Sequence, residues 1–196
     1  MLKKLLLTAS LLLSFTAVAE ESATAKEAAT PAANPEVIIR TTEGDISLVL
    51  FADKAPVTVE NFLAYVDSGY YAGTIFHRVI NNFMIQGGGF DKDMIQKATR
   101  DPIKNESRNR LHNTRGTIAM ARTNDPDSAT SQFYINQRSN LQLDWKPGRD
   151  GYTVFGEVTE GMGIVDFIAT SPTARHRNGM ADVPVEAIVI KEVVRK

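Results

Sequence analysis

One arginine, Arg78, lies inside a mostly apolar, strand-like run that reads FHRVINNFMIQGGGF from Phe76 to Phe90. The run also holds the side-chain amide of Gln86 and the glycines 87–89. An unpaired charge among apolar residues is costly to bury, so Arg78 needs either a partner or a ligand. Arginine stays protonated and donates several hydrogen bonds from one plane. The run therefore indicates a site where a fixed cation meets a polar group beside apolar surface.

Other reaction chemistries lack the residues or the spacing that they need. The chain has no cysteine, which excludes disulfides, thiolate catalysis and cysteine zinc sites. His77, His112 and His176 are scattered without metal-ligand spacing, so we predict no metal and no cofactor. Ser128 and Ser131 lack the G-x-S-x-G setting of a serine hydrolase.

Three features of the apolar run allow more than one interpretation. The glycines 87–89 lack the Lys-Ser/Thr sequel and the helix of a phosphate-binding loop, so we predict that they form a tight turn. His77 follows Phe76 in a strand-like setting and is interpreted as a structural histidine whose polar atoms have partners. Taken alone, Arg78 is open to two functions, catalysis or a structural ion pair with an acid at a sheet edge.

The bulk composition is that of one soluble globular domain. The chain has 196 residues, of which 43% are hydrophobic and 23% charged. The formal net charge of −1 gives no reason to expect the basic face that nucleic acids require, so we predict no nucleic-acid partner. Nothing in the sequence suggests an obligate interface, which favours a monomer.

The first 19 residues are typical of a cleaved secretory signal peptide. Lys3 and Lys4 precede an apolar run over 5–18, and Ala17-Val18-Ala19 matches a small-residue cleavage site. The run is short for a membrane span, so we predict no stable membrane insertion after cleavage. Residues 20–34 contain no large apolar side chain and are predicted to form a disordered mature N-terminus. Export without an anchor or a retention signal favours the bacterial periplasm, with secretion as the alternative.

Residues 35–196 form the predicted domain, in which short β-like runs are separated by Gly, Asn and Asp. One helix is predicted from Pro56 to Ser68-Gly69 and another over Met162–Ala169, whereas Asp91–Asn113 is predicted to be loop. Many short strands favour an all-β barrel or sandwich. The predicted strands are 36–41, 46–51, 74–80, 83–86, 116–121, 133–135, 153–158 and 185–194.

Three segments, in this order, together resemble the cyclophilins, a family of peptidyl-prolyl cis-trans isomerases. They are FHRVINNFMIQGG from Phe76, SQFYIN from Ser131 and GYTVFG from Gly151. The similarity covers Glu36 to Val194. It implies a mainly β fold, namely a closed eight-stranded antiparallel β-barrel capped by two α-helices. It also implies an enzyme that needs no cofactor and rotates X-Pro bonds in exported or unfolded, proline-containing polypeptides.

The resemblance implies roles for ten residues. Arg78 matches the catalytic arginine of the family. The expected walls of the proline pocket are Phe83, Met84, Tyr134 and Leu143. Gln86 and Gln132 are expected to hold both the substrate and Arg78. The remaining substrate-binding positions are Ala121, Arg122 and Tyr152.

Two positions depart from the family pattern. Gln142 stands where members carry Trp or Phe before a Leu-Asp pair, a position that helps to bind cyclosporin, so we expect weak cyclosporin binding. Tyr134 replaces a phenylalanine and adds a hydroxyl near the proline ring. Trp145 is a candidate to supply part of the missing aromatic surface. The departures leave an alternative open, a proline-peptide-binding chaperone or scaffold with little catalytic activity.

The pocket also places a demand on the backbone. Phe83 and Met84 are adjacent, and neighbours on a regular strand face opposite sides. If both line the pocket, the backbone must be irregular there, and Asn81-Asn82 makes a bend plausible.

Overall fold

The structure is a computed structural model that describes residues 34–196. The predicted signal peptide at 1–19 and all but Asn34 of the predicted segment 20–34 lie outside the described residues. Within 34–196, none of the helices combines the length and the apolar character that a membrane crossing needs.

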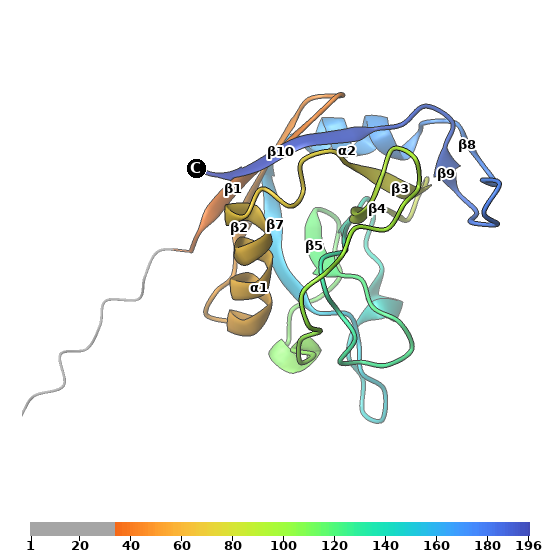
Figure 1. The fold of residues 1–196 in the computed structure, drawn as a ribbon. Coiled ribbons are helices and arrows are strands. Elements are labelled where there is room, and N and C mark those ends of the chain that lie inside the picture. Colours follow the sequence, from red (N-terminus) through yellow and green to blue (C-terminus); the bar gives the residue numbers. More distant parts are fainter. Residues whose placement is uncertain (1–33) are drawn as a thin grey trace, which may run out of the picture. The chain divides into compact units, whose positions relative to one another are not determined.

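Eight strands close into an antiparallel barrel, which confirms the predicted fold class (Figure 1). The strands are β1 (Glu36–Thr41), β2 (Asp45–Leu50), β3 (Thr74–Ile80), β4 (Met84–Asp91), β5 (Thr117–Met120), β6 (Phe133–Asn136), β7 (Val154–Glu160) and β10 (Val189–Arg195). Their order around the barrel is β1-β10-β3-β4-β6-β5-β7-β2. Closure gives each of the eight barrel strands a partner strand on both sides.

Both predicted helices are present, and Figure 1 shows them on different sides of the barrel. They are α1 (Pro56–Asp67) and α2 (Met162–Ala169), with short 3-10 helices at Ser107–Asn109 and Leu141–Leu143. Pro56 opens α1, where a missing N–H costs nothing. The Glu106 carboxylate, from the predicted loop, accepts hydrogen bonds from the Val57 and Thr58 amides. The loop therefore caps the N-terminus of α1, whose own N-cap residue makes no side-chain hydrogen bond.

The wall formed by β6 and β5, with most of β4 and the first three residues of β7, is buried on both faces. Along β6, Phe133 and Ile135 pack in the main core, whereas Tyr134 belongs to a second apolar cluster. On β5, Ile118 packs in the main core and Ala119 in the second cluster. Because side chains alternate between the faces of a strand, the second cluster lies on the opposite side of the sheet from the core.

The glycines 87–89 lie inside β4, so the predicted tight turn is wrong. Gly88 has a φ of 79°, and the pairing of β3 with β4 shifts register on both sides of Phe76. A Cβ on Gly88 would lie 2.9 Å from ring carbons of Tyr71 and Phe133. The glycines therefore allow two aromatic rings to pack closely against an irregular strand.

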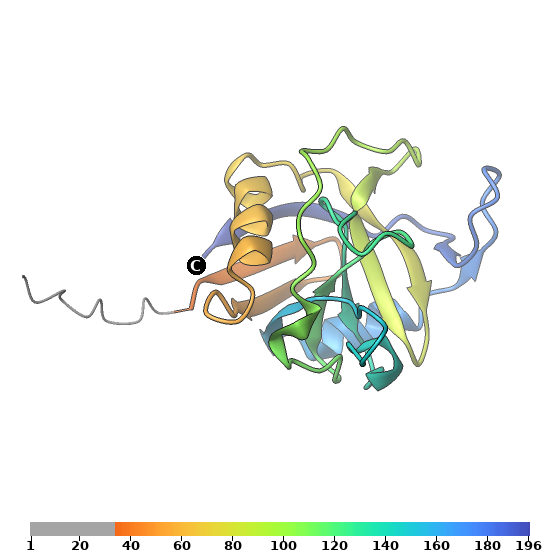
Figure 2. The ribbon, with the colours of Figure 1, turned by 90° about the horizontal axis from the view of Figure 1, so that it is seen from below.

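A two-stranded sheet outside the barrel was not predicted. It pairs β8 (Thr173–Ala174) with β9 (Val183–Pro184), and the hairpin projects away from the barrel (Figures 1 and 2). The predicted strand 185–194 is correspondingly wrong at its start, because residues 185–188 connect β9 to β10. The pairing of β3 with β10 is short. Farther along β3, the Val79 amide donates a hydrogen bond to the carbonyl of Asp182 and not to β10.

Candidate active site

Nine of the ten predicted site residues line one cavity of about 270 Å³. Its apolar part is the second cluster, on the outer face of the barrel wall. The lining residues are Arg78, Phe83, Met84, Gln86, Ala121, Arg122, Tyr134, Leu143 and Tyr152. The fold therefore gathers residues from β3, β4 and β6 with two loops that are distant in the sequence.

The apolar wall of the cavity combines a strand residue with a turn residue. Met84 begins β4 and is buried, and Phe83 lies in the preceding turn, where Asn82 has a φ of 57°. This left-handed residue is the irregularity that lets two adjacent side chains reach one cavity. Half-buried Leu143 and buried Tyr134 complete the wall.

Arg78 stands at the polar edge of the cavity and is not buried. Its side chain is 42% exposed, so the desolvation cost that the sequence suggested is largely avoided. Its Nε lies 3.7 Å from Oδ2 of Asp182, a charge contact longer than a hydrogen bond. The guanidinium makes no hydrogen bond to any residue between 34 and 196. Its donors are therefore available to a ligand in the cavity.

The two glutamines bind each other. Gln86 donates a 3.0 Å hydrogen bond to the side-chain oxygen of Gln132. Gln132 packs over Gly89, where a Cβ would lie 2.4 Å from its Cγ, and it does not line the cavity. Gln86 is opposite Arg78 in the strand register, yet neither amide bonds the guanidinium in the described part of the chain. The expected hydrogen bonds to Arg78 are therefore not found there.

Arg122 is held by the backbone. Its guanidinium donates to the carbonyl oxygens of Thr123 and Asp150 at 2.8 Å and of Gly151 at 3.2 Å. It also stacks over the Tyr152 ring, 4.5 Å from the ring centroid. The Arg122–Tyr152 pair is therefore a fixed part of the cavity rim, unlike the uncommitted guanidinium of Arg78.

A buried polar network lies behind the pocket wall. The Tyr134 hydroxyl donates to Oδ1 of Asn113, whose own side-chain nitrogen donates to Asp144. His112 contacts the other Asp144 oxygen at 2.8 Å. Burial raises the pKa of Tyr134 well above its ordinary range. Burial acts to raise the pKa of Asp144 too, but hydrogen bonds from Asn113 and His112 outweigh it and lower that pKa.

Sequence reasoning missed Asn113, although one signal pointed toward it. A tyrosine at a buried strand position needs a polar partner for its hydroxyl. No local sequence signal predicted a function for Asp182, because only the fold of the β8–β9 hairpin brings this residue next to Arg78.

His77 lies outside the cavity, as its interpretation as a structural histidine requires. It is 1% exposed and packs 4.7 Å from the Phe90 ring centroid. Burial lowers its pKa to about 4, and contacts with the Ile75 backbone and the Gln132 side chain oppose this shift. Its Nδ1 has no hydrogen-bond partner among residues 34–196, so the expectation that its polar atoms have partners is wrong for this nitrogen. A neutral, enclosed imidazole of this kind is a poor proton donor.

Trp145 does not replace the missing aromatic side chain at position 142. Gln142 is exposed on the short helix Leu141–Leu143. Trp145 lies beyond it, 36% exposed, with the Arg108 guanidinium 5.5 Å over its ring. Neither Gln142 nor Trp145 lines the cavity, to which this short helix contributes Leu143.

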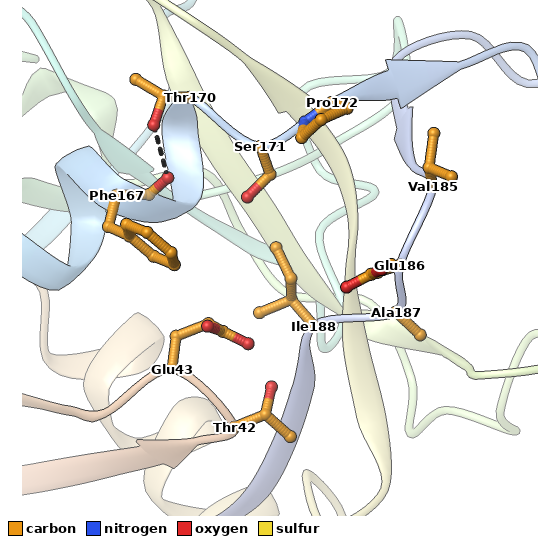
Figure 3. Close-up of a pocket in the computed structure, with 10 residues that line it drawn as sticks. All are labelled: Thr42, Glu43, Phe167, Thr170, Ser171, Pro172, Val185, Glu186, Ala187 and Ile188. Carbon is orange, nitrogen blue, oxygen red and sulfur yellow. Dashed lines mark hydrogen bonds between the residues drawn. The ribbon is translucent and has the colours of Figure 1, made fainter.

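A separate cavity of about 450 Å³ lies between the end of α2 and residues 185–188 (Figure 3). Its charged lining groups are two carboxylates, Glu43 and Glu186, and it has no cationic donor. Phe167 and Val185 give it an exposed apolar rim. Within 34–196, no three acidic or histidine side chains group together as metal ligands. The chemistry suggested by Arg78 therefore belongs to the smaller cavity.

The fold and the cavity together define a class of protein. A closed β-barrel presents an apolar pocket of small-ring size beside a guanidinium whose donors are free. Such a site suits a ring next to a polar peptide group, and the described residues that line it include no nucleophile paired with a base. Catalysis here would act on conformation and not on covalent bonds.

Comparisons with known proteins agree with this class. The family described as cyclophilin type peptidyl-prolyl cis-trans isomerase/CLD matches residues 36–195. A peptidyl-prolyl cis-trans isomerase of Acinetobacter baylyi is 52% identical over 162 residues, covering 82% of this chain and 85% of the relative. Peptidyl-prolyl cis-trans isomerase B of Escherichia coli K12 is 54% identical over 162 residues, covering 80% and 97%.

A solved structure agrees as well. The cyclophilin type peptidyl-prolyl cis-trans isomerase of Cryptosporidium parvum, crystallised in the presence of the dipeptide Ala-Pro, has a TM-score of 0.68 and 30% identity, covering 82% of this chain and 98% of that one. The chain belongs to the cyclophilin-type peptidyl-prolyl cis-trans isomerase family. Its activity is isomerisation of the peptide bond before proline.

Proposed function

We propose that the chain isomerises X-Pro bonds in exported or unfolded polypeptides in the periplasm, with Arg78 as its catalytic residue. The observation that supports this role is the guanidinium at the edge of an apolar cavity, without a hydrogen bond in the described domain. The Ala-Pro dipeptide used with the Cryptosporidium relative is the kind of ligand that this cavity would accept.

The reaction requires a twisted peptide bond. Resonance gives the planar bond a barrier of about 18–20 kcal/mol. In the twisted state the prolyl nitrogen becomes pyramidal and regains a lone pair. A cation that donates a hydrogen bond to this nitrogen stabilises the twisted state over both planar states, which is the condition for catalysis. A preorganised donor of this kind contributes about 2.7–4 kcal/mol.

The pocket walls supply the other half of the mechanism. Phe83, Met84 and Tyr134 would bury the proline ring and fix one side of the bond while the preceding carbonyl rotates. Apolar walls also exclude water, which strengthens the charge-assisted hydrogen bond from Arg78. No proton transfer is required at any step.

The activity is tested by the cis-to-trans rate of a short X-Pro peptide. The account expects the wild-type chain to accelerate this rate well above the uncatalysed relaxation of tens of seconds or more. Binding of the peptide without acceleration would instead support the alternative, a proline-peptide-binding chaperone or scaffold.

The proposed location rests on the residues that precede the described domain. Lys3 and Lys4, the apolar run 5–18 and Ala17-Val18-Ala19 are typical of a cleaved signal peptide. N-terminal sequencing of protein from a periplasmic fraction should begin at Glu20. A start at Met1 would contradict export by cleavage. Proline-containing polypeptides are the proposed partners, and a monomer is the proposed state.

Cyclosporin is expected to bind weakly. Gln142 is exposed and offers no aromatic face, and Trp145 lies outside the cavity lining. Inhibition of the peptide assay by cyclosporin should therefore strengthen in a Gln142→Trp variant. Equal inhibition of both proteins would show that this position does not limit the affinity.

A further inference from the structure

Asp182 and Arg78 meet across the surface although they are far apart in the sequence. Arg78 lies on β3, and Asp182 immediately precedes β9, which runs beside β3 (Figure 1). The Nε of Arg78 is 3.7 Å from Oδ2 of Asp182, and the two side chains are 42% and 40% exposed. No other carboxylate in the described domain lies within ion-pair distance of Arg78.

The backbone of Asp182 is held in place independently of its carboxylate. Its carbonyl accepts a 2.8 Å hydrogen bond from the Val79 amide, the residue after Arg78. Asp182 has a φ of 62°, a left-handed conformation that aspartate and asparagine tolerate better than most residues. The next residue, Val183, is buried against Ile75. The carboxylate therefore projects from a fixed point next to the guanidinium.

The contact with Asp182 leaves the two terminal guanidinium nitrogens of Arg78 free. Asp182 approaches Nε, whereas the terminal nitrogens have no hydrogen-bond partner in the described domain, and Arg78 lines the cavity. An exposed arginine has many rotamers, and most of them would carry the guanidinium away from a bound proline. A charge beside Nε restricts these rotamers before substrate binds, which lowers the ordering cost in the transition state.

The geometry points to Asp182 as a positioning residue for Arg78, an inference that rests on the proposed catalytic role of Arg78. The contact is longer than a hydrogen bond and half exposed, so its contribution is that of a surface ion pair. Loss of such a pair corresponds to a decrease in rate of about two- to fivefold. Since the guanidinium acts on the twisted bond, the decrease should fall on kcat, with KM little changed.

Asp182→Asn isolates the charge. Asparagine tolerates the left-handed conformation and keeps the carbonyl that binds the Val79 amide, so the backbone is preserved. The peptide isomerisation assay should show kcat lowered about two- to fivefold. Glu186→Gln is the matched control, because this substitution also removes one negative charge from the segment that follows β8. Glu186 does not contact Arg78 and does not line this cavity. Its kcat should equal that of the wild type.

A double-mutant cycle separates positioning from a structural effect. In an Arg78→Ala background no guanidinium remains to be positioned, so Asp182→Asn should produce no further loss. An equal loss in both backgrounds, or an unchanged kcat in Asp182→Asn alone, would overturn the inference. The Arg78→Ala protein also tests the role on which the inference rests. If it keeps wild-type kcat, both the catalytic role of Arg78 and the positioning role of Asp182 are wrong.

Discussion

The hydroxyl of Tyr134 donates a 2.7 Å hydrogen bond to the side-chain oxygen of Asn113, a residue with no solvent exposure. Asn113 is held in turn by Asp144 at 2.9 Å, and it also accepts a hydrogen bond from Asn136 at 3.2 Å. The polar end of Tyr134 is therefore tied to the domain interior, while its ring lines the cavity. At this position, the tyrosine ring presents the same kind of apolar wall as the phenylalanine that the family resemblance implied.

Removal of this hydroxyl should affect stability more than activity. Tyr134→Phe deletes one buried hydrogen bond but leaves Asn113 with its partner Asn136, so the free energy of unfolding should fall by about 1 kcal/mol. The kcat/KM for an X-Pro peptide should remain within about twofold, because the ring is unchanged. Urea denaturation and the peptide assay measure the two quantities.

Tyr134→Ala is the companion variant, since it removes the ring as well. It should lower kcat/KM strongly, because the proline loses one wall of its pocket. If Tyr134→Phe lost as much activity as Tyr134→Ala, the hydroxyl would have a direct function in the cavity.

The stability of the domain should depend on His77 at mildly acidic pH. Burial lowers the pKa of His77 to about 4, from an ordinary value of 6.5. Between these values the unfolded chain binds a proton that the folded chain does not, so stability is complete above pH 6.5 and decreases as the pH falls toward 4. The decrease should reach about 3 kcal/mol. Urea denaturation across this pH range measures it.

His77→Phe provides the control for this dependence. Phenylalanine is apolar, can contact Phe90 and does not titrate, so the variant should show a much flatter profile between pH 6.5 and 4. Asp144 and Asp166, whose pKa values are lowered, lose their contributions at more acidic pH and do not obscure this window. A variant that retained the full wild-type slope would assign the titration to another group.

The glycines offer a matched pair of substitutions. Gly73 and Gly88 have similar φ values, 76° and 79°, but only Gly88 has neighbours where a Cβ would stand. Gly73→Ala should cost about 1–2 kcal/mol, from the left-handed backbone alone. Gly88→Ala should cost a further 1–3 kcal/mol or so, because its methyl would press on Tyr71 and Phe133. Equal destabilisation of both variants would contradict the close-packing account of β4.

The main elements of the fold could be predicted because their signals are local. Short β-like runs separated by Gly, Asn and Asp predicted the barrel strands, and Pro56 predicted the start of α1. The glycines 87–89 were assigned wrongly because glycine favours turns and close packing equally, and only the distant rings of Tyr71 and Phe133 decide between them. The strands β8 and β9 have two residues each, which is too short for a pattern of alternating side chains to be recognised.

The sequence predicted which residues form the site better than it predicted the contacts that these residues make. The motif residues gather at one cavity, yet the partners that fix them come from segments with no motif. Asn113 lies at the end of a polar stretch, and Asp182 lies in a hairpin that projects from the barrel. Such contacts depend on the tertiary path of the chain, which a single sequence does not reveal through spacing.

The central claim is that Arg78 accelerates rotation about the X-Pro bond, and it is tested most directly by the kcat/KM of Arg78→Ala in the peptide isomerisation assay. Arg40→Ala is the control, because Arg40 is exposed on β1, pairs with Glu192 and does not line the cavity. The account predicts a loss of about 10²–10³-fold for Arg78→Ala and no loss for Arg40→Ala. A folded Arg78→Ala protein with the kcat/KM of the wild type would contradict it.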